Sequence, residues 1–290
     1  SRIRMLLTPR ELEIFIDRAL EEDSVGSDVT TWALIPLHLE ARASLIPKES
    51  GILAGLDVAA AVFKRVNPDL VFTQKLLDGD RVEGGEIVAI ISGSMASILT
   101  AERTALNFLQ RMSGIATLTD QYVQAVEGTP ASIADTRKTV PGLRLLDKYS
   151  VSIGGGRNHR MNLTDGVLIK DNHLAALSGE GVSLGQAIKR ARARAPHTVK
   201  IEVEVETIDA ALAATAAGAD IVMLDNMSPT EMRNAVDQIA ADCIVEASGN
   251  VTLVNVAEIA HSGVDIISVG ALTHSVRALD ISLDYETNNA

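Results

Sequence analysis

The chain has 290 residues and a formal net charge of −12, with 47% hydrophobic residues but only 3% aromatic ones. The acidic balance argues against a general nucleic-acid binder, which needs a basic face for phosphates, and against adhesion to anionic membranes. With so few aromatic side chains, the core must be built from Ala, Val, Ile and Leu, which is typical of helices and strands packed in α/β layers.

The single cysteine, Cys243, excludes an intramolecular disulfide and indicates an intracellular protein. Cys243 lies in an apolar run, so we expect it to be a small core residue. No run approaches the roughly 18 apolar residues that a membrane span requires. Residues 1–15 lack the apolar region and small-residue cleavage site of a signal peptide. We therefore expect a cytoplasmic protein that binds neither membranes nor nucleic acid.

The first 100 residues mix helical and strand patterns. Thr8 and Glu11 have the spacing of a capping box, followed by a helical stripe of apolar residues. We expect a strand and turn over 41–55, a helix over 56–66, and two strands around glycine turns over 74–93.

A long helix is expected from about Thr100 to residue 126. Thr100 can cap it, and Glu102 favours its first turn. Gly114 is a candidate for an internal break.

After Gly128 the pattern changes to short apolar runs, each ending at a polar residue or a glycine. The runs are 132–138, 166–172, 199–206, 220–226, 243–250 and 265–271. Their ends recur every 21 or 22 residues from Glu204 onward, and helical stretches intervene. This rhythm predicts repeated β-α units and a parallel sheet. An open sheet and a closed barrel would both give it. We favour a barrel, because its strand ends converge on one face, and six strands are legible.

Charges gather where these strands end. Residues 135–175 contain seven Lys or Arg and four Asp, so the window carries +3 in a protein of −12. Arginine binds carboxylates and phosphates through a planar fork, which lysine cannot do. The sequence therefore predicts a cationic pocket for a small, strongly anionic ligand.

Acidic and small residues end the later strands. Carboxylates such as Glu204 and Asp225 beside a phosphate site hold Mg²⁺ or bind sugar hydroxyls. Ser248, Gly249 and Gly270 can bind phosphate through backbone N–H groups, as loops in this part of a barrel do.

Each of these residues also has a purely structural interpretation. Arg137 and Lys138 could pair with nearby carboxylates, and Lys170 could be a solvated strand-end residue. Glu204 could belong to one face of a half-exposed strand, and a lone histidine such as His159 is more often structural than catalytic. Because such residues recur together at the ends of successive strands, we favour a binding or catalytic site over these structural interpretations.

At these residues the chain resembles the quinolinate phosphoribosyltransferase family. The resemblance is carried by "ADTRKTVPGLRLLDKYSVSIGGGRNHR", "LIKDNH", "EVEVET", "IVMLDNM", "EASGN" and "GVDIISVGALTHS", and in the first half by "GSDVTT", "GILAGLDVA" and "AERTALNFLQRMSGIAT". It spans roughly residues 8 to 280.

The resemblance implies an α/β fold in three parts. These are an N-terminal α/β sandwich domain over 1–113, an incomplete, TIM-like α/β barrel over 114–276, and a tail over 277–290 that returns to the first domain. It also implies a homodimer with shared active sites. Whether dimers assemble further is left open.

The resemblance implies a reaction as well. Quinolinate and phosphoribosyl pyrophosphate, with Mg²⁺, would give nicotinate mononucleotide, pyrophosphate and CO₂, a step of NAD synthesis.

The resemblance also carries over residue roles. Arg137, His159 and Arg160 match the family's quinolinate-binding residues, and Lys138 and Lys170 match its catalytic lysines. The remaining matches are Arg103, contributed by the partner subunit, Glu204 and Asp225 on the ribose and metal side, and Ser248, Gly249, Gly270 and His274 at the phosphate-binding end.

Three other functions stay open at this point. A paralogue of the molybdenum-transport-associated type shares much of the pattern with a different substrate. A non-catalytic anion-binding protein would need the arginines but not Glu204 and Asp225 together with the phosphate loops. A structural barrel without a site is disfavoured by the net positive charge of residues 135–175 in an otherwise acidic chain.

Overall fold

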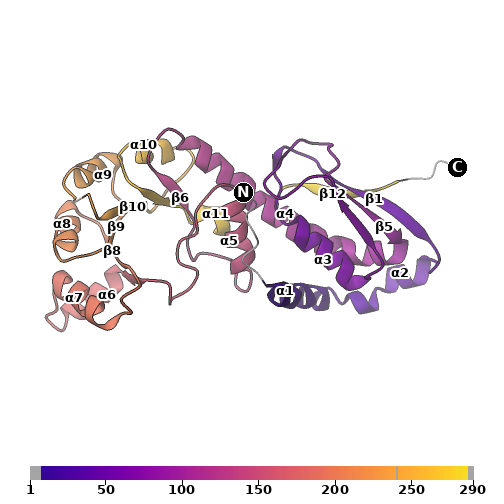
Figure 1. Cartoon of the computed structure of the whole chain (residues 1–290), viewed down its shortest axis with the longest axis horizontal. Helices are drawn as coiled ribbons and strands as arrows, with labels where there is room; N and C mark the ends of the chain where they lie inside the picture. The colour runs from indigo at the N-terminus through magenta and orange to yellow at the C-terminus, as the bar shows by residue number, and fades with distance from the viewer. Residues whose placement is uncertain (1–7, 240, 287–290) are drawn as a thin grey trace. The chain divides into compact units, whose positions relative to one another are not determined.

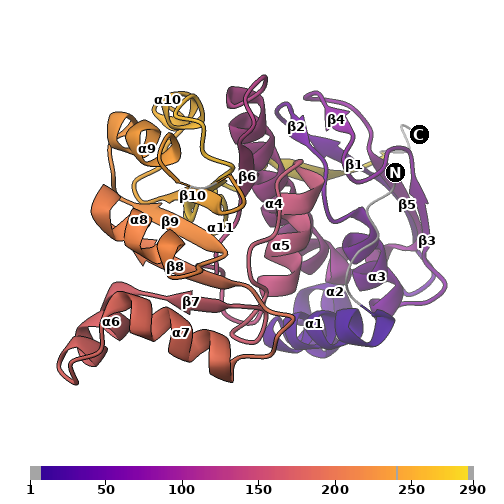
Figure 2. The same cartoon turned by 60° about the vertical axis from the view of Figure 1, so that its left-hand side comes forward.

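A computed structural model describes residues 8–239 and 241–286, and the chain forms two compact units (Figure 1, Figure 2). The first unit contains the described residues up to Asp120, Thr139–Gly155, and those from Ser275 onward. The second contains Gln121–Lys138 and Gly156–His274. Within the described part of the chain, no helix is long and apolar enough to cross a bilayer.

The first unit is built on an antiparallel sheet of order β12-β1-β5-β3. Its strands are β1 (Glu40–Pro47), β3 (Val71–Gln74), β5 (Ala89–Ser94) and β12 (Ile281–Tyr285), and β2 (Gly51–Ile52) pairs separately with β4 (Arg81–Val82). The helices are α1 (Pro9–Glu22), α2 (Val29–Leu34), α3 (Leu56–Val66), α4 (Met95–Ala125) and α5 (Arg144–Ile153), with a 3-10 turn at Val25–Ser27. Buried Leu45, Phe63, Ile91 and Leu109 belong to its core.

Several local predictions for this unit are confirmed. Thr8 and Glu11 form the capping box reciprocally, with the Thr8 hydroxyl accepting the Glu11 N–H and the Glu11 carboxylate accepting the Thr8 N–H. The helix expected over 56–66 is α3. Near the end of the chain, Leu283 of β12 lies opposite Leu45 of β1.

Two predictions about the long helix are wrong. The helix α4 begins at Met95, directly after β5, so Thr100 lies inside it and its hydroxyl donates to Asp28 at 2.9 Å. Gly114 does not break the helix. A Cβ at Gly114 would lie 2.3 Å from the carbonyl oxygen of Arg277, so the glycine is there to let two backbone segments approach closely.

The second unit is a six-stranded parallel sheet of order β6-β11-β10-β9-β8-β7. Its strands are β6 (Ser132–Ala134), β7 (Val167–Ile169), β8 (Ile201–Val205), β9 (Ile221–Asp225), β10 (Ile244–Ser248) and β11 (Ile266–Ser268). Its helices are α6 (Asp171–Ser178), α7 (Leu184–Arg194), α8 (Ile208–Ala216), α9 (Pro229–Val236), α10 (Val256–Ala260) and α11 (Ala271–His274). Figure 1 shows α8, α9 and α10 along one side of this sheet.

The predicted fold class is confirmed. All six apolar runs are strands, and Cys243 beside β10 is buried. Within the described residues the pairing runs from β6 to β7 without closing, so the barrel is incomplete. The boundaries expected at 113 and 276 stay a prediction.

Replacing Gly114 by alanine should lower the free energy of unfolding by about 2–3 kcal/mol, because the new Cβ meets a backbone carbonyl that cannot move alone. A matched control is Gly185→Ala in α7, where the Cβ would lie 3.6 Å from the Ala217 Cβ, an ordinary contact. That change should be neutral or stabilise by up to about 1 kcal/mol. Urea unfolding of both variants checks the prediction, and equal midpoints for the two would contradict it.

Candidate functional site

A cavity of about 590 Å³ lies where the strands of the second unit end. Nine of the predicted site residues line it: Arg137, Lys138, His159, Arg160, Lys170, Glu204, Asp225, Ser248 and Gly249. Thr136, Glu246, Asn226, Asn250 and Ser268 also line it and were not predicted as site residues. The carboxyl ends of parallel strands meet at one edge of a sheet, which is why residues far apart in sequence converge here.

Arg137 and Lys138 follow β6 and are exposed. Among the described residues, no ion pair involves either side chain, so they do not simply neutralise nearby carboxylates. The Lys138 backbone is fixed instead, because its N–H donates to the Thr136 hydroxyl at 3.1 Å and its carbonyl accepts the Thr273 hydroxyl at 2.8 Å. Two cations are thus held at the cavity without a protein partner.

Gly270 and His274 lie beside Lys138 rather than among the lining residues. A Cβ at Gly270 would lie 3.0 Å from Lys138 Cδ and 3.2 Å from His274 Nε2. The absence of a side chain at Gly270 therefore leaves room for the lysine stem next to the imidazole.

Asp135 positions the loop that carries His159, and the sequence did not indicate this role. Its carboxylate is fully buried and accepts hydrogen bonds from Asn158 Nδ2 at 2.7 Å and from the His159 N–H at 2.8 Å. The Asp135 N–H donates to the Arg157 carbonyl at 3.1 Å. An aspartate directly after an apolar strand was the available signal, because acidic residues are seldom fully buried without such partners.

Lys170 and Glu204 form an ion pair across neighbouring strands, with Nζ 3.3 Å from Oε2. The Lys170 side chain is 47% exposed, and pairs so exposed contribute at most about 1 kcal/mol to stability. The pair therefore adds little to the fold and leaves the ammonium group accessible from the cavity.

Left-handed backbone gathers at the ends of β9 and β10. Asn226, Gly249 and Asn250 have φ of 54°, 88° and 50°. A Cβ at Gly249 would lie 2.3 Å from Asn226 Oδ1, and Asn250 Nδ2 donates to that same oxygen at 2.9 Å. Asn226 Nδ2 donates in turn to Asp225 Oδ2 at 2.7 Å, so this network orients the Asp225 carboxylate. Such strained conformations cluster at binding sites.

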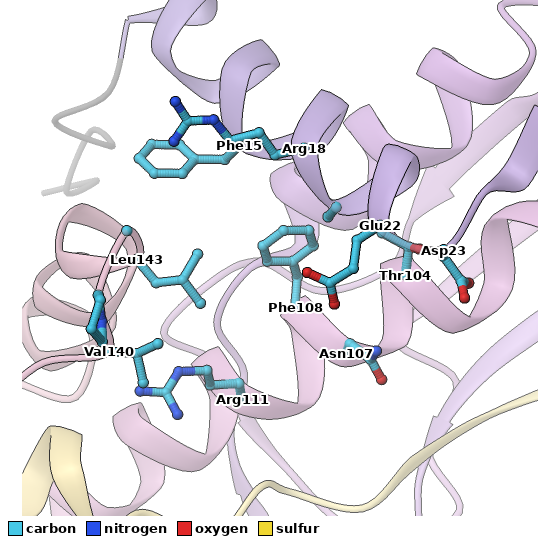
Figure 3. Close-up of a pocket in the computed structure, with 13 residues that line it drawn as sticks. Phe15, Arg18, Glu22, Asp23, Thr104, Asn107, Phe108, Arg111, Val140 and Leu143 are labelled. Atoms are coloured by element: carbon cyan, nitrogen blue, oxygen red, sulfur yellow. The ribbon is translucent and has the colours of Figure 1, made fainter.

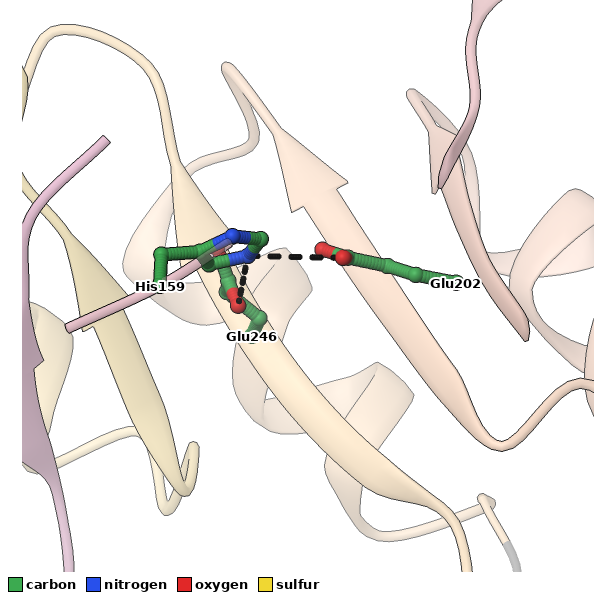
Figure 4. A group of neighbouring side chains, drawn as sticks. All are labelled: His159, Glu202 and Glu246. Atoms are coloured by element: carbon green, nitrogen blue, oxygen red, sulfur yellow. Dashed lines mark ion pairs between the residues drawn. The ribbon is translucent and has the colours of Figure 1, made fainter. Parts of the chain in front are cut away.

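Two glutamates, Glu202 and Glu246, lie against His159 at the buried base of the site (Figure 4). Each places Oε2 3.3 Å from His159 Nε2. Burial opposes charge on the imidazole, but the two carboxylates outweigh it and raise the pKa of His159 to about 10. Burial raises the pKa of Glu202, and His159 opposes that shift. Burial likewise lowers the pKa of Arg160.

Sequence reasoning missed both glutamates, although signals existed. Glu202 and Glu204 are two residues apart on β8, so they point to the same face. Glu246 is a charge in the middle of a buried apolar strand, which is rare unless it is paired.

Arg103 lies apart from this set. It is an exposed residue of α4 in the first unit and does not line the cavity.

A second cavity, of about 500 Å³, lies within the first unit. Figure 3 shows Phe15, Phe108 and Leu143 around it. Its Arg111 is already committed to buried Asp147, through bonds of 3.0 and 2.9 Å. Arg18, Glu22, Asp23 and Asn107 also line the cavity, but none of the predicted site residues does.

Family models match nearly the whole described chain. The model for the quinolinate phosphoribosyl transferase N-terminal domain matches residues 28–113, and the model for the C-terminal domain matches residues 115–284.

Individual proteins match over nearly their full length. A probable nicotinate-nucleotide pyrophosphorylase (carboxylating) of Bacillus subtilis is 40% identical over 96% of this chain and 95% of its own. A nicotinate-nucleotide pyrophosphorylase (carboxylating) of Mycobacterium leprae is 44% identical over 93% and 95%. The solved structure of NadC from Streptococcus pyogenes is 43% identical, with a TM-score of 0.92 over 99% of this chain and 100% of that one.

Asp135→Asn should disorganise the His159 loop, because an amide nitrogen would face donors that need an acceptor. We expect a loss of about 1–3 kcal/mol in unfolding free energy and weaker binding of a small aromatic dicarboxylate such as phthalate, measured by calorimetry. Asp209→Asn, an exposed aspartate of α8 in the same unit, is the control. Phthalate affinities that stay equal in both variants would show that Asp135 has no such role.

Proposed function

Because the chain belongs to the quinolinate phosphoribosyl transferase family, we propose that its strand-end cavity transfers the phosphoribosyl group of phosphoribosyl pyrophosphate to quinolinate. The products are nicotinate mononucleotide, pyrophosphate and CO₂, so the enzyme is a decarboxylating pentosyltransferase of NAD synthesis. The observation that carries this assignment is the cluster of cations at the strand ends of an otherwise acidic protein, in which Arg137 and Lys138 form no ion pair among the described residues.

Quinolinate is a pyridine with two adjacent carboxylates, and Arg137, His159 and Arg160 suit it. Arginine forks bind carboxylates with two parallel hydrogen bonds, which fixes the plane of the ring as well as its charge. Holding quinolinate beside a second polyanion is unfavourable in water, and these cations offset that repulsion. Binding in this way orients the ring nitrogen for attack on C1 of the ribose.

Lys138 and Lys170 suit the leaving pyrophosphate. Negative charge develops on it as the bond to C1 breaks, and fixed ammonium groups stabilise such charge without reorganising. C1 gains oxocarbenium character at the same time. The carboxylates of Glu204 and Asp225, which end neighbouring strands, supply the opposite charge or bind the ribose hydroxyls.

The same two carboxylates fit Mg²⁺. The ion takes hard oxygen ligands and is commonly held by one or two carboxylates together with substrate phosphates. Glu204 and Asp225 both line the cavity and offer that donor set. When bound, Mg²⁺ neutralises charge on the pyrophosphate.

Ser248, Gly249, Gly270 and His274 suit the ribose 5-phosphate end. A Cβ would collide with Asn226 at Gly249 and would press on the Lys138 stem at Gly270, so both positions keep the backbone accessible, and its N–H groups can bind phosphate there. After transfer the ring nitrogen is cationic, so its positive charge stabilises the electron pair that the departing CO₂ leaves at C2. The substrate thus supplies its own electron sink and needs no decarboxylase cofactor.

We further propose a homodimer in which Arg103 of one subunit serves the cavity of the other. Support comes from the exposure of Arg103 and from four large apolar residues on and after α2, Val29, Trp32, Leu34 and Leu37, which are 71–91% exposed. Contiguous exposed apolar side chains favour association. The cytoplasmic location expected from the single cysteine stays a prediction.

The purified protein should form nicotinate mononucleotide and CO₂ from quinolinate, phosphoribosyl pyrophosphate and Mg²⁺, and nothing from nicotinate. Arg137→Ala should lower kcat/KM for quinolinate by about 100-fold, the value of a lost charge-assisted contact. Arg194→Ala, an exposed arginine of α7, is the control and should leave turnover unchanged. Folded wild-type protein that forms no product would favour the paralogue or the binding protein. Near-normal turnover of Arg137→Ala would refute the role of that arginine.

Mixing inactive Arg103→Ala with inactive Lys138→Ala should restore activity if the site is shared. After random exchange half of the dimers are mixed, and each contains one intact site, so about one quarter of the wild-type activity should return. Each variant taken alone through the same exchange is the control. No recovery despite verified exchange would mean that each site is built within one chain.

A further inference from the structure

The reaction proposed above needs a proton at C2 of the ring as CO₂ leaves, and none of the roles assigned so far provides it. His159, Glu202 and Glu246, which we call the buried triad, lie at the base of the same cavity. The inference below concerns that proton and rests on the proposed function.

The triad joins two strands and one loop. Glu202 comes from β8, Glu246 from β10, and His159 from the loop that Asp135 holds. The glutamates are 3% and 0% exposed, and both point at the imidazole (Figure 4). Two carboxylates buried around one ring nitrogen repel each other, so the group favours an additional proton.

The two glutamates differ in what else they face. Glu246 lines the cavity and Glu202 does not. Apart from its ion pair with His159, neither carboxylate oxygen of Glu246 has a hydrogen-bond partner among the described residues. A buried carboxyl group without a partner is costly, so its position toward the substrate space indicates a partner in the bound ligand.

The proton count of the triad follows from its hydrogen bonds. The Arg160 N–H points at His159 Nδ1 at 2.8 Å, so the ring proton belongs on Nε2, between the glutamates. The additional proton that repulsion between the glutamates favours is shared by the triad, which then has a net charge of −1 wherever the proton resides. Of the two carboxyl groups only Glu246 lines the cavity, so the proton reaches the substrate through Glu246.

The same three side chains could in principle hold a divalent cation. A histidine that binds a metal presents a bare nitrogen to it and donates its other N–H to an acceptor. Here the other nitrogen, Nδ1, faces a donor instead. The hydrogen bonding therefore favours a proton site.

We propose that Glu246 is the acid that protonates C2, with His159 holding the carboxyl group in position and sharing its proton. As the bond from C2 to the carboxylate breaks and CO₂ leaves, a proton from Glu246 moves to C2 in the same step. The electron pair of the broken bond forms the new C2–H bond. The triad, left with one more negative charge, regains a proton from water when the product leaves.

The test separates transfer from decarboxylation in single turnovers with quinolinate, phosphoribosyl pyrophosphate and Mg²⁺. Glu246→Gln keeps the shape but cannot donate an acidic proton. It should release pyrophosphate at a rate near that of the wild type, form CO₂ about 100-fold more slowly, and accumulate the mononucleotide that still carries both carboxylates.

Glu202→Gln is the matched control. It removes an equally buried carboxylate at the same 3.3 Å from His159 Nε2, but one that does not line the cavity. If this variant is slower than the wild type, its rates of pyrophosphate release and CO₂ formation should fall by the same factor. Glu246→Asp, which keeps the acid at shorter reach, should give a ratio of CO₂ to pyrophosphate rates between those of wild type and Glu246→Gln.

The inference would be overturned if Glu246→Gln slowed pyrophosphate release and CO₂ formation by the same factor. It would also be overturned if CO₂ still formed as fast as pyrophosphate is released. If Glu246→Gln does not fold, Glu246→Asp decides, and a wild-type ratio in that variant refutes the inference. A wild-type protein that releases neither product would count against the proposed function itself, so the two failures are distinguishable.

Discussion

Repulsion among cations is the constraint around which the second unit is organised. Arg137, Lys138, Arg160 and Lys170 must stay close together before any anion arrives, although like charges at this range repel each other. Glu202 and Glu246 lie beneath them as a buried layer of opposite charge, and Glu204 pairs with Lys170. The negative layer is deep and the positive one accessible, so an anion entering the cavity meets cations first.

Rigid anchors keep the cations in place where ion pairs do not. The Lys138 backbone is bonded on both sides, and Asp135 fixes the loop of His159 through three separate bonds. These anchors leave the Lys138 ammonium group without an ion pair among the described residues. A site held by its own ion pairs would have to break them on binding, at a cost in affinity.

The sequence pattern predicted most of the architecture of the second unit, because a parallel sheet repeats one physical unit. Regular spacing of apolar runs located all six strands, and their last residues located the cavity. The hydrogen bonds of Asp135 were beyond reach, because they join residues whose proximity depends on how the loop after α5 returns to β6. Glu246 looked like one more strand residue, since a single sequence does not reveal which side of a strand faces a ligand.

The two errors in α4 have a common cause. Thr100 and Gly114 were interpreted by local preference, as a cap and a break. In the structure both positions are decided by segments distant in the sequence, Asp28 for the hydroxyl and Arg277 for the glycine. Local preference is a weak guide inside a helix that packs on several neighbours.

Trp32, the single tryptophan, is 86% exposed on α2 and contributes nothing to the core of its unit. Its indole is therefore already surrounded by water in the folded chain. Intrinsic tryptophan fluorescence will change little when a single chain unfolds, and in the dimer proposed above it will respond to separation of the surfaces that cover α2. The usual optical signal of folding thus becomes, in this molecule, a selective reporter of contacts at one surface, and unfolding has to be followed by backbone signals.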